Sequence, residues 1–224
     1  MDFGKAFTYV SEDPDWLKKI GLGGVIAIVP ILNFAVAGYS LEVSRRVINN
    51  EPRPLPEWDD IGGKLVKGFL VAVIGLVYGL PNILLSCVSQ AAAQAPQLLS
   101  SGSSQAPDQT ILTIVMVVTA CFGCLSFLYG VFMALVLPAA IGNYAAKGQL
   151  GAAFRFGEVF GLVQKNIGTY LMVLLISIAA GIVAALGLIA CVIGVIFTAF
   201  YSQLVMGHAI GQAYREASAN VGLV

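Results

Sequence analysis

The chain has 224 residues, of which 58% are hydrophobic and only 11% are charged, and its formal net charge is zero. A soluble domain usually carries about 25% charged side chains, so this composition excludes an ordinary water-soluble protein. The balanced charge and the lack of a basic helix in the sequence argue against a nucleic-acid partner. We therefore expect an all-α fold, a polytopic helical membrane bundle that forms one domain and has the lipid bilayer as its first partner.

The first 19 residues are expected to form an interfacial segment. Phe3 and Phe7 stand against Asp2 and Lys5 in a weakly amphipathic pattern, which is typical of a segment that lies on a membrane surface. The segment ends in "EDPDWLKKIG", where Trp16 precedes a long apolar run.

Residues 20–43 are apolar, but Pro30 divides them into two pieces. Each piece has about ten residues, which is too short to cross about 30 Å of hydrocarbon. We therefore favour a re-entrant hairpin, in which Asn33 forms hydrogen bonds with backbone groups freed at the break. A single kinked span is the alternative, because about 24 residues can cross a bilayer with a modest tilt.

Residues 44–64 are predicted to form a cytoplasmic loop, which contains the polar, proline-rich stretch "NEPRPLPEWDD". The simpler interpretation is interfacial anchoring, because tryptophan rings suit the lipid headgroup level and acids favour a helix N-terminus. The alternative is partner docking, because acids beside arginines suit a polar protein contact. The candidate residues for either role are Trp16, Trp58, Asp59, Asp60, Arg45 and Arg46.

Four further apolar runs are each long enough to cross the hydrocarbon core. These predicted spans are residues 65–89, 111–138, 168–187 and 188–209. The linker 90–110 contains no lysine or arginine and is expected outside, with both termini and the basic loops in the cytoplasm. Residues 151–166 place apolar and charged side chains on opposite helical faces, which predicts an interfacial helix on the cytoplasmic surface.

Small residues four positions apart recur in the spans, and this spacing lets helices approach closely in lipid. The pairs are Gly75 with Gly79, Ser177 with Gly181, and Gly207 with Gly211. They predict a compact bundle and leave open a homo-oligomer.

Polar side chains within spans are costly in lipid and are therefore candidates for function. The candidate intramembrane polar site consists of Asn33, Asn82, Gln203 and His208. Pro30 lies near Asn33, and Pro81 precedes Asn82, so two broken helices could frame a substrate or ion site. The alternative, which we favour, is that each amide satisfies a backbone group freed by its proline or bridges neighbouring helices.

The cysteines and the single histidine form no recognisable metal or catalytic motif. Cys121 and Cys124 make a CxxC pair inside a predicted span, where cysteine packs as a small apolar residue. Cys87 and Cys191 both lie toward the outer leaflet, so a disulfide between them is conceivable. The sequence has no Walker loop, GxSxG or HExxH. We therefore expect no enzymatic activity and no catalytic, metal-binding or cofactor-binding residue.

The stretch "GYSLEVSRRVINNEPRPLPEWDD" followed by "GGKLVKG", with "DPDWLKKIGLGG" upstream and "GHAIGQAYRE" near the far end, resembles an uncharacterised prokaryotic membrane family, domain of unknown function 4013. The resemblance covers essentially the whole chain, and LPEWDD is its most specific part. It implies a multi-pass prokaryotic membrane protein and supplies no activity or substrate. With the charge distribution, it predicts the cytoplasmic (inner) membrane, with the C-terminus in the cytoplasm.

Our leading functional hypothesis is a non-enzymatic membrane protein that acts through assembly, as a subunit, scaffold or self-associating component. Its partners would be further copies of the chain or other membrane protein subunits, which would contact the 50–60 loop and the 151–166 helix. The alternative is a small transporter or channel that uses the proline-broken helices near Asn33 and Asn82.

Overall fold

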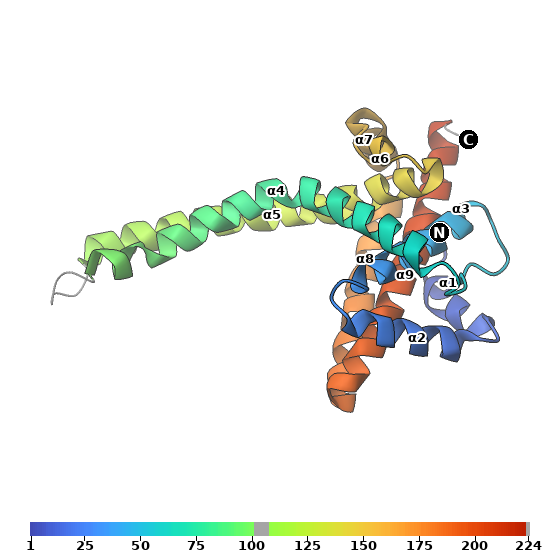
Figure 1. The fold of residues 1–224 in the computed structure, drawn as a ribbon. Coiled ribbons are helices and arrows are strands. Elements are labelled where there is room, and N and C mark those ends of the chain that lie inside the picture. Colours follow the sequence, from blue (N-terminus) through green and yellow to red (C-terminus); the bar gives the residue numbers. More distant parts are fainter. Residues whose placement is uncertain (101–107, 223–224) are drawn as a thin grey trace. The chain divides into compact units, whose positions relative to one another are not determined.

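A computed structural model describes residues 1–100 and 108–222, and the side chains of residues 98–100 and 190–193 lie outside this description. Every regular element in the described residues is a helix, which confirms the predicted all-α class (Figure 1). The elements are α1 (Phe3–Thr8), η1 (Tyr9–Glu12), α2 (Trp16–Ile28), α3 (Asn33–Ile48), α4 (Ile61–Ser100), α5 (Gln109–Lys147), α6 (Leu150–Ala153), α7 (Phe156–Lys165), α8 (Ile167–Leu186), η2 (Gly187–Ala190) and α9 (Cys191–Val221).

Within the described residues, four helical segments are long and apolar enough to cross a membrane, in agreement with the predicted number of spans. They are Ile61–Gln97, Gln109–Lys147, Ile167–Ile189 and Gly194–Val221. The first of these segments belongs to α4, which continues to Ser100, beyond the predicted end of the span at residue 89. Alanine and glutamine in "QAAAQ" are good helix formers, which accounts for the extension of the helix into the polar linker.

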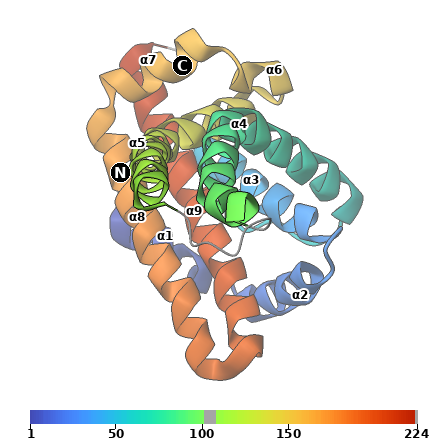
Figure 2. The ribbon, with the colours of Figure 1, turned by 90° about the vertical axis from the view of Figure 1, so that its left-hand side faces the viewer.

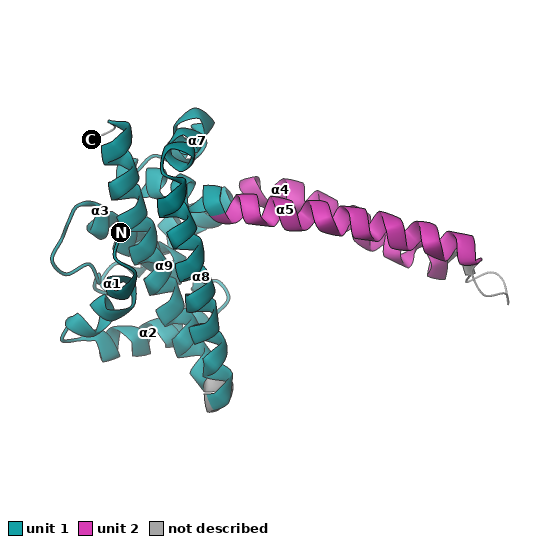
Figure 3. Cartoon of the chain, turned by 180° about the vertical axis from the view of Figure 1, so that it is seen from behind, with its two compact units in different colours: residues 1–75, 135–224 teal, residues 76–134 magenta. Residues whose placement is uncertain are grey.

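The chain divides into two compact units, which are described separately (Figure 3). Unit 1 comprises Met1–Gly75 and Leu135–Val224, and unit 2 comprises Leu76–Ala134. The helices α4 and α5 have 40 and 39 residues, so each is about 60 Å long. Each of them contributes residues to both units. A bilayer core needs only about 20 helical residues, so each of these helices has enough length for both a span and a packed extension.

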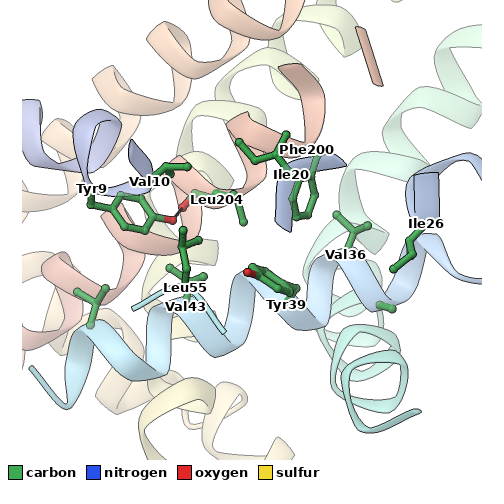
Figure 4. Close-up of a cluster of buried hydrophobic side chains, with 12 residues drawn as sticks. Tyr9, Val10, Ile20, Ile26, Val36, Tyr39, Val43, Leu55, Phe200 and Leu204 are labelled. Atoms are coloured by element: carbon green, nitrogen blue, oxygen red, sulfur yellow. Dashed lines mark hydrogen bonds between the residues drawn. The ribbon is translucent and has the colours of Figure 1, made fainter. Parts of the chain in front are cut away.

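In unit 1, α9 is the central helix and packs against α1, α2, α3, α7 and α8 (Figure 2). One buried cluster joins α9 to η1, α2, α3 and the loop before α4, and it includes Tyr9, Tyr39, Leu55, Phe200 and Leu204 (Figure 4). A second cluster joins α9 to α1 and α8. The N-terminal segment is therefore part of the core, since Ala6, Tyr9 and Val10 are buried.

Small residues on α9 allow α3 to pack very closely, as the spacing of Gly207 and Gly211 predicts. A Cβ atom added to Gly207 would lie 2.5 Å from the Ser40 carbonyl oxygen, and one on Gly211 would lie 2.7 Å from that of Ser44. The hydroxyls of the same serines donate to carbonyls of α9 at 2.7 Å, Ser40 to Gln203 and Ser44 to Gly207. The crossing is therefore held by both contact and hydrogen bonding.

A second close crossing, between α3 and α4 within unit 1, depends on Gly38 and Gly68. A Cβ atom on Gly38 would lie 1.8 Å from the Lys64 carbonyl oxygen, and one on Gly68 would lie 1.6 Å from that of Phe34. Neither position accepts a larger residue without separating the helices. In contrast, nothing lies within 4 Å of a Cβ added to Gly75, Gly79 or Gly181.

Two predicted segments each form two helices, the first with the break expected at Pro30 and the second with a break that was not expected. Residues 20–43 form parts of α2 and α3, separated by a turn at 29–32 that contains Pro30, and the two helices pack against each other. Entry of this helix pair into the membrane stays a prediction. Residues 151–166 form α6 and α7, with a break at Phe154 and Arg155. Phe156 is exposed, whereas Val159 and Val163 are buried.

Unit 2 is an antiparallel hairpin made from the second part of α4 and the first part of α5. The Tyr129 hydroxyl donates to the Tyr78 carbonyl at 2.7 Å, which fixes the register of the two helices. Large apolar side chains such as Leu84 and Phe127 are exposed on it. Such surfaces are expected in lipid.

Candidate functional site

The proline-rich stretch before α4 is anchored in the core of unit 1 by its apolar residues. The Trp58 ring stacks on Tyr39 with centroids 4.4 Å apart, and its indole nitrogen donates to the Lys19 carbonyl at 3.1 Å. Leu55 is buried, and the Pro56 carbonyl accepts a hydrogen bond from the Tyr39 hydroxyl at 2.6 Å. Both backbone and side chains therefore hold this loop in one conformation.

Lys19 lies in the core beside this loop and bridges two carboxylates. Its ammonium group is 2.9 Å from Asp13 and 2.7 Å from Glu57. Burial by itself lowers the pKa of Lys19, but the hydrogen bonds to both acids outweigh burial and raise the pKa above its usual value. For Asp13 burial acts upward, and the Lys19 hydrogen bond brings its pKa below the usual value. The lysine and Asp13 are therefore both charged at neutral pH.

Lys64, in the first turn of α4, makes a second bridge of the same kind. Its ammonium group lies 3.7 Å from Glu42 on α3 and 3.5 Å from Asp59 on the loop. It also lies 6.0 Å from the centroid of the Tyr39 ring, within cation–π range. Glu42 additionally pairs with Lys67 at 3.4 Å and with Arg46 at 3.4 Å. An ion-pair network therefore joins α3, α4 and the loop.

The two bridges share one pattern, a buried lysine between a largely buried acid and an exposed acid. Asp13 and Glu42 expose 8% and 19% of their side chains, whereas Glu57 and Asp59 expose 66% and 80%. Asp60 is also exposed, and its side chain accepts from the Gly63 amide at 2.8 Å. We call Glu57, Asp59 and Asp60 the acidic loop surface. Backbone hydrogen bonds to its carboxylate lower the pKa of Asp59, so Asp59 stays charged at neutral pH.

The other residues predicted for anchoring or docking lie around this network. Trp16 is partly buried against the same core cluster. Arg46 donates to the Leu55 carbonyl at 3.3 Å, whereas Arg45 is exposed. Most of the predicted set is thus brought together on one side of unit 1.

The four predicted intramembrane polar residues are not brought together and have three kinds of surroundings. Asn33 and Gln203 are exposed on unit 1. His208 is buried there, stacks on Tyr9 at 4.2 Å and lies 3.0 Å from the Gln212 amide. Asn82 belongs to unit 2, where its side-chain oxygen is buried without a hydrogen-bond partner. The helix break that the transporter alternative places beside Asn82 is absent, since α4 runs through Pro81 as a helix.

An open cavity of about 830 Å³ lies beside His208, between the N-terminus, the 50–54 loop and α9. Its lining carries both signs of charge, including Lys5, Arg215, Glu51 and Glu216. The Met1 amino group and Arg215 are already engaged, with Glu216 at 2.5 Å and Asn50 at 2.6 Å respectively. No group of three or more His, Cys, Asp or Glu residues within the described ranges could hold a metal ion.

The described cysteines are Cys87, Cys121 and Cys124, and all three are free and exposed. The side chain of Cys191 lies outside the described residues, and so does the disulfide considered for it.

Several buried polar residues at helix junctions were not anticipated from the sequence. Asn143 on α5 is fully buried, donates to the Ala152 carbonyl at 2.8 Å and to Glu158 at 3.1 Å, and accepts from the Tyr214 hydroxyl at 3.0 Å. Lys147, Asn143 and Arg155 all bind Glu158, which lowers the pKa of Glu158 to about 2. The lone Asn143 in an apolar run was the available signal.

Comparison with known proteins finds no match among curated proteins and none among solved structures. A family model described as protein of unknown function (DUF4013) matches residues 22–193, which include α3, the acidic loop surface and both helices of unit 2. The match extends over more than half of the chain, and the described structure has the apolar helices of a membrane protein. The chain therefore belongs to this family of proteins of unknown function.

Proposed function

We propose that this protein is a non-enzymatic integral membrane protein that acts through assembly, and that the acidic loop surface is a contact face for a cationic segment of another membrane protein. This face would lie in the cytoplasm, as the positive-inside rule predicts. The second contact element would be the start of α7, where Phe156 and the preceding Arg155 are exposed.

The observation that supports this proposal most directly is the difference in burial among the acids around the buried lysines. Asp13 and Glu42 are largely buried and each neutralises a lysine within the fold. Glu57 and Asp59 face water, where solvent screens an ion pair and its contribution to stability is small. The fold therefore has little need of the exposed carboxylates, whereas a basic partner would be attracted by them.

The loop is also preorganised for binding. Trp58 and Leu55 hold its backbone on the core, so a partner would not have to order the loop on contact. Ordering interface segments costs affinity, and a fixed surface avoids much of that cost.

Transport ranks second in this proposal. It would require a helix break beside Asn82 as well as the one beside Asn33, and α4 is continuous at Pro81. A break at Pro30 alone supports a hydrated path less than breaks at both Pro30 and Pro81 would.

The test neutralises the acidic loop surface with isosteric residues, Glu57→Gln, Asp59→Asn and Asp60→Asn together. Asparagine caps a helix about as well as aspartate, so α4 keeps its start, and both lysines keep their buried acids. The size of the native complex is measured after mild extraction from the membranes of the source cell. We expect the variant to run as a smaller complex.

The control is Glu12→Gln with Asp108→Asn, which removes exposed charges elsewhere in the chain. It should leave the complex intact. This role for the loop would be refuted if the neutralised variant had unchanged thermal stability and formed a complex of the same size as wild type.

A further inference from the structure

Unit 2 carries a polar stripe on α4 that the hairpin itself does not use. Ser86, Gln90 and Gln94 recur every fourth residue and are exposed, and none of their side chains forms a hydrogen bond in the described structure. They line a groove of about 620 Å³ with Asn82, whose side-chain oxygen is buried and unpaired, and with Cys87. Since α4 turns by about 100° per residue, these positions share one side of the helix.

The stripe lies at the depth of an apolar part of α5. Tyr129 contacts Tyr78 across the antiparallel hairpin, so Gln90, twelve residues beyond Tyr78, lies level with Val117, twelve residues before Tyr129. The helices run side by side along this length (Figures 2 and 3). Val117 and its neighbour Ile114 are exposed, as lipid-facing residues are. We infer that Gln90 lies at a depth where water is scarce and an unpaired amide is unfavourable, whereas the sequence alone placed residue 90 at the start of the external linker.

A second copy of the chain fits this stripe better than a lipid does. Each primary amide has both donors and an acceptor, so a row of them is complementary to the same row related by a two-fold axis. Amide side chains that bond across helices stabilise association in membranes, and the exposed serine and Ala91 allow close approach. Lipid tails offer no hydrogen bond to these groups.

We propose that unit 2 self-associates through the Asn82–Ser86–Gln90–Gln94 face of α4, which pairs with the same face of a second copy. The inference rests on the proposed assembly function and names one of its partners. It uses a surface distinct from the acidic loop surface. The two proposals can therefore fail separately.

The experiment is disulfide trapping of the full-length chain in membranes, with the native cysteines replaced by alanine. One variant carries Ser86→Cys, in the stripe, and the matched control carries Val88→Cys, which is exposed two residues further along on the opposite side of α4. After mild oxidation, we expect Ser86→Cys to form a species of twice the chain mass. The yield should be at least about tenfold higher than that of Val88→Cys.

A second variant tests the amides. Gln90→Leu with Gln94→Leu, added to Ser86→Cys, should lower the cross-linking yield by about tenfold to a hundredfold at low protein density, because several amide contacts are lost per dimer. Neutralising the acidic loop surface in the Ser86→Cys chain should leave the yield unchanged, which separates this inference from the proposed function.

Three results would overturn the inference. The first is equal cross-linking at the two positions, which indicates random collision. The second is an adduct of another mass, which indicates a different protein on the stripe. The third is a yield that the leucine pair does not change.

Discussion

Replacing Trp58 by alanine should release the acidic loop from unit 1. The ring is half-buried between Tyr39 and Phe200, with centroid distances of 4.4 and 5.9 Å, and its nitrogen donates to the Lys19 carbonyl. Full burial of a tryptophan is worth about 3–5 kcal/mol on truncation, so half burial gives about 2 kcal/mol. The lost hydrogen bond adds about 1 kcal/mol, for a total of about 3 kcal/mol.

This loss can be read from proteolysis of the loop. The peptide bond after Glu57 is a site for a glutamate-specific protease, and its cleavage requires local opening when opening is fast relative to cleavage. A loss of about 3 kcal/mol raises the open population, and hence the rate of formation of fragment 1–57, by up to about a hundredfold. Trp58→Phe keeps the stacking and loses only the hydrogen bond, so an increase of about fivefold is expected.

Cleavage after the exposed Glu12 serves as the internal reference, because the tryptophan does not contact it. The reasoning would be refuted if Trp58→Ala raised cleavage after Glu57 by less than about twofold relative to that reference. The tryptophan would then act elsewhere, for example at the lipid headgroups.

Three further predictions concern the packing of unit 1, and each is checked by unfolding of the purified chain in mild detergent. Gly68→Ala should lower the free energy of unfolding by more than about 3 kcal/mol, because its methyl group would lie 1.6 Å from the Phe34 carbonyl oxygen. Gly75→Ala is the control: its methyl group meets nothing within 4 Å, so the free energy of unfolding should stay the same or rise by up to about 1 kcal/mol. Asn143→Leu should lower the free energy of unfolding by about 2–4 kcal/mol, since it leaves the buried hydrogen-bond partners of Asn143 unpaired. A loss below about 1 kcal/mol would contradict a stabilising role for these hydrogen bonds. For Glu158 the folded pKa of about 2 lies below the ordinary 4.5, so its stabilisation is complete above pH 4.5 and is lost as the pH falls toward 2. The stability advantage of wild type over Glu158→Gln should shrink by about 1 kcal/mol between pH 6 and pH 3, a figure reduced for the 29% exposure of the side chain, and an advantage that grows toward low pH would contradict the sign.

The helical class and the number of spans could be predicted because both follow from apolar runs along the sequence. The Pro30 break and the close approach at Gly207 and Gly211 were predictable too, since each depends on a local residue pattern. The division at Phe154 was not, because an amphipathic repeat continues across it. A local sequence pattern cannot predict a turn that is stabilised by residues on other helices.

The acidic loop surface was only partly predictable. Proline, acid and tryptophan in sequence suit a lipid headgroup boundary as well as a protein core, and the stacking of Trp58 on Tyr39 decides between them only in three dimensions. Lys64 could not be identified as buried, because its partner Glu42 lies on another helix. The crossing of Gly38 and Gly68 was hidden for the same reason, since the two glycines lie on different helices, α3 and α4.

The most direct test of the assembly proposal is carboxylate footprinting of Glu57, Asp59 and Asp60 with a water-soluble carbodiimide, read by mass spectrometry. The acids are exposed in the isolated chain, so they should react readily after purification to a single protein. In native membranes we expect labelling of all three to fall at least about fivefold, while labelling of the exposed Glu12 stays constant. Equal labelling of the acidic loop surface in both preparations would contradict the account, because no partner would then cover it.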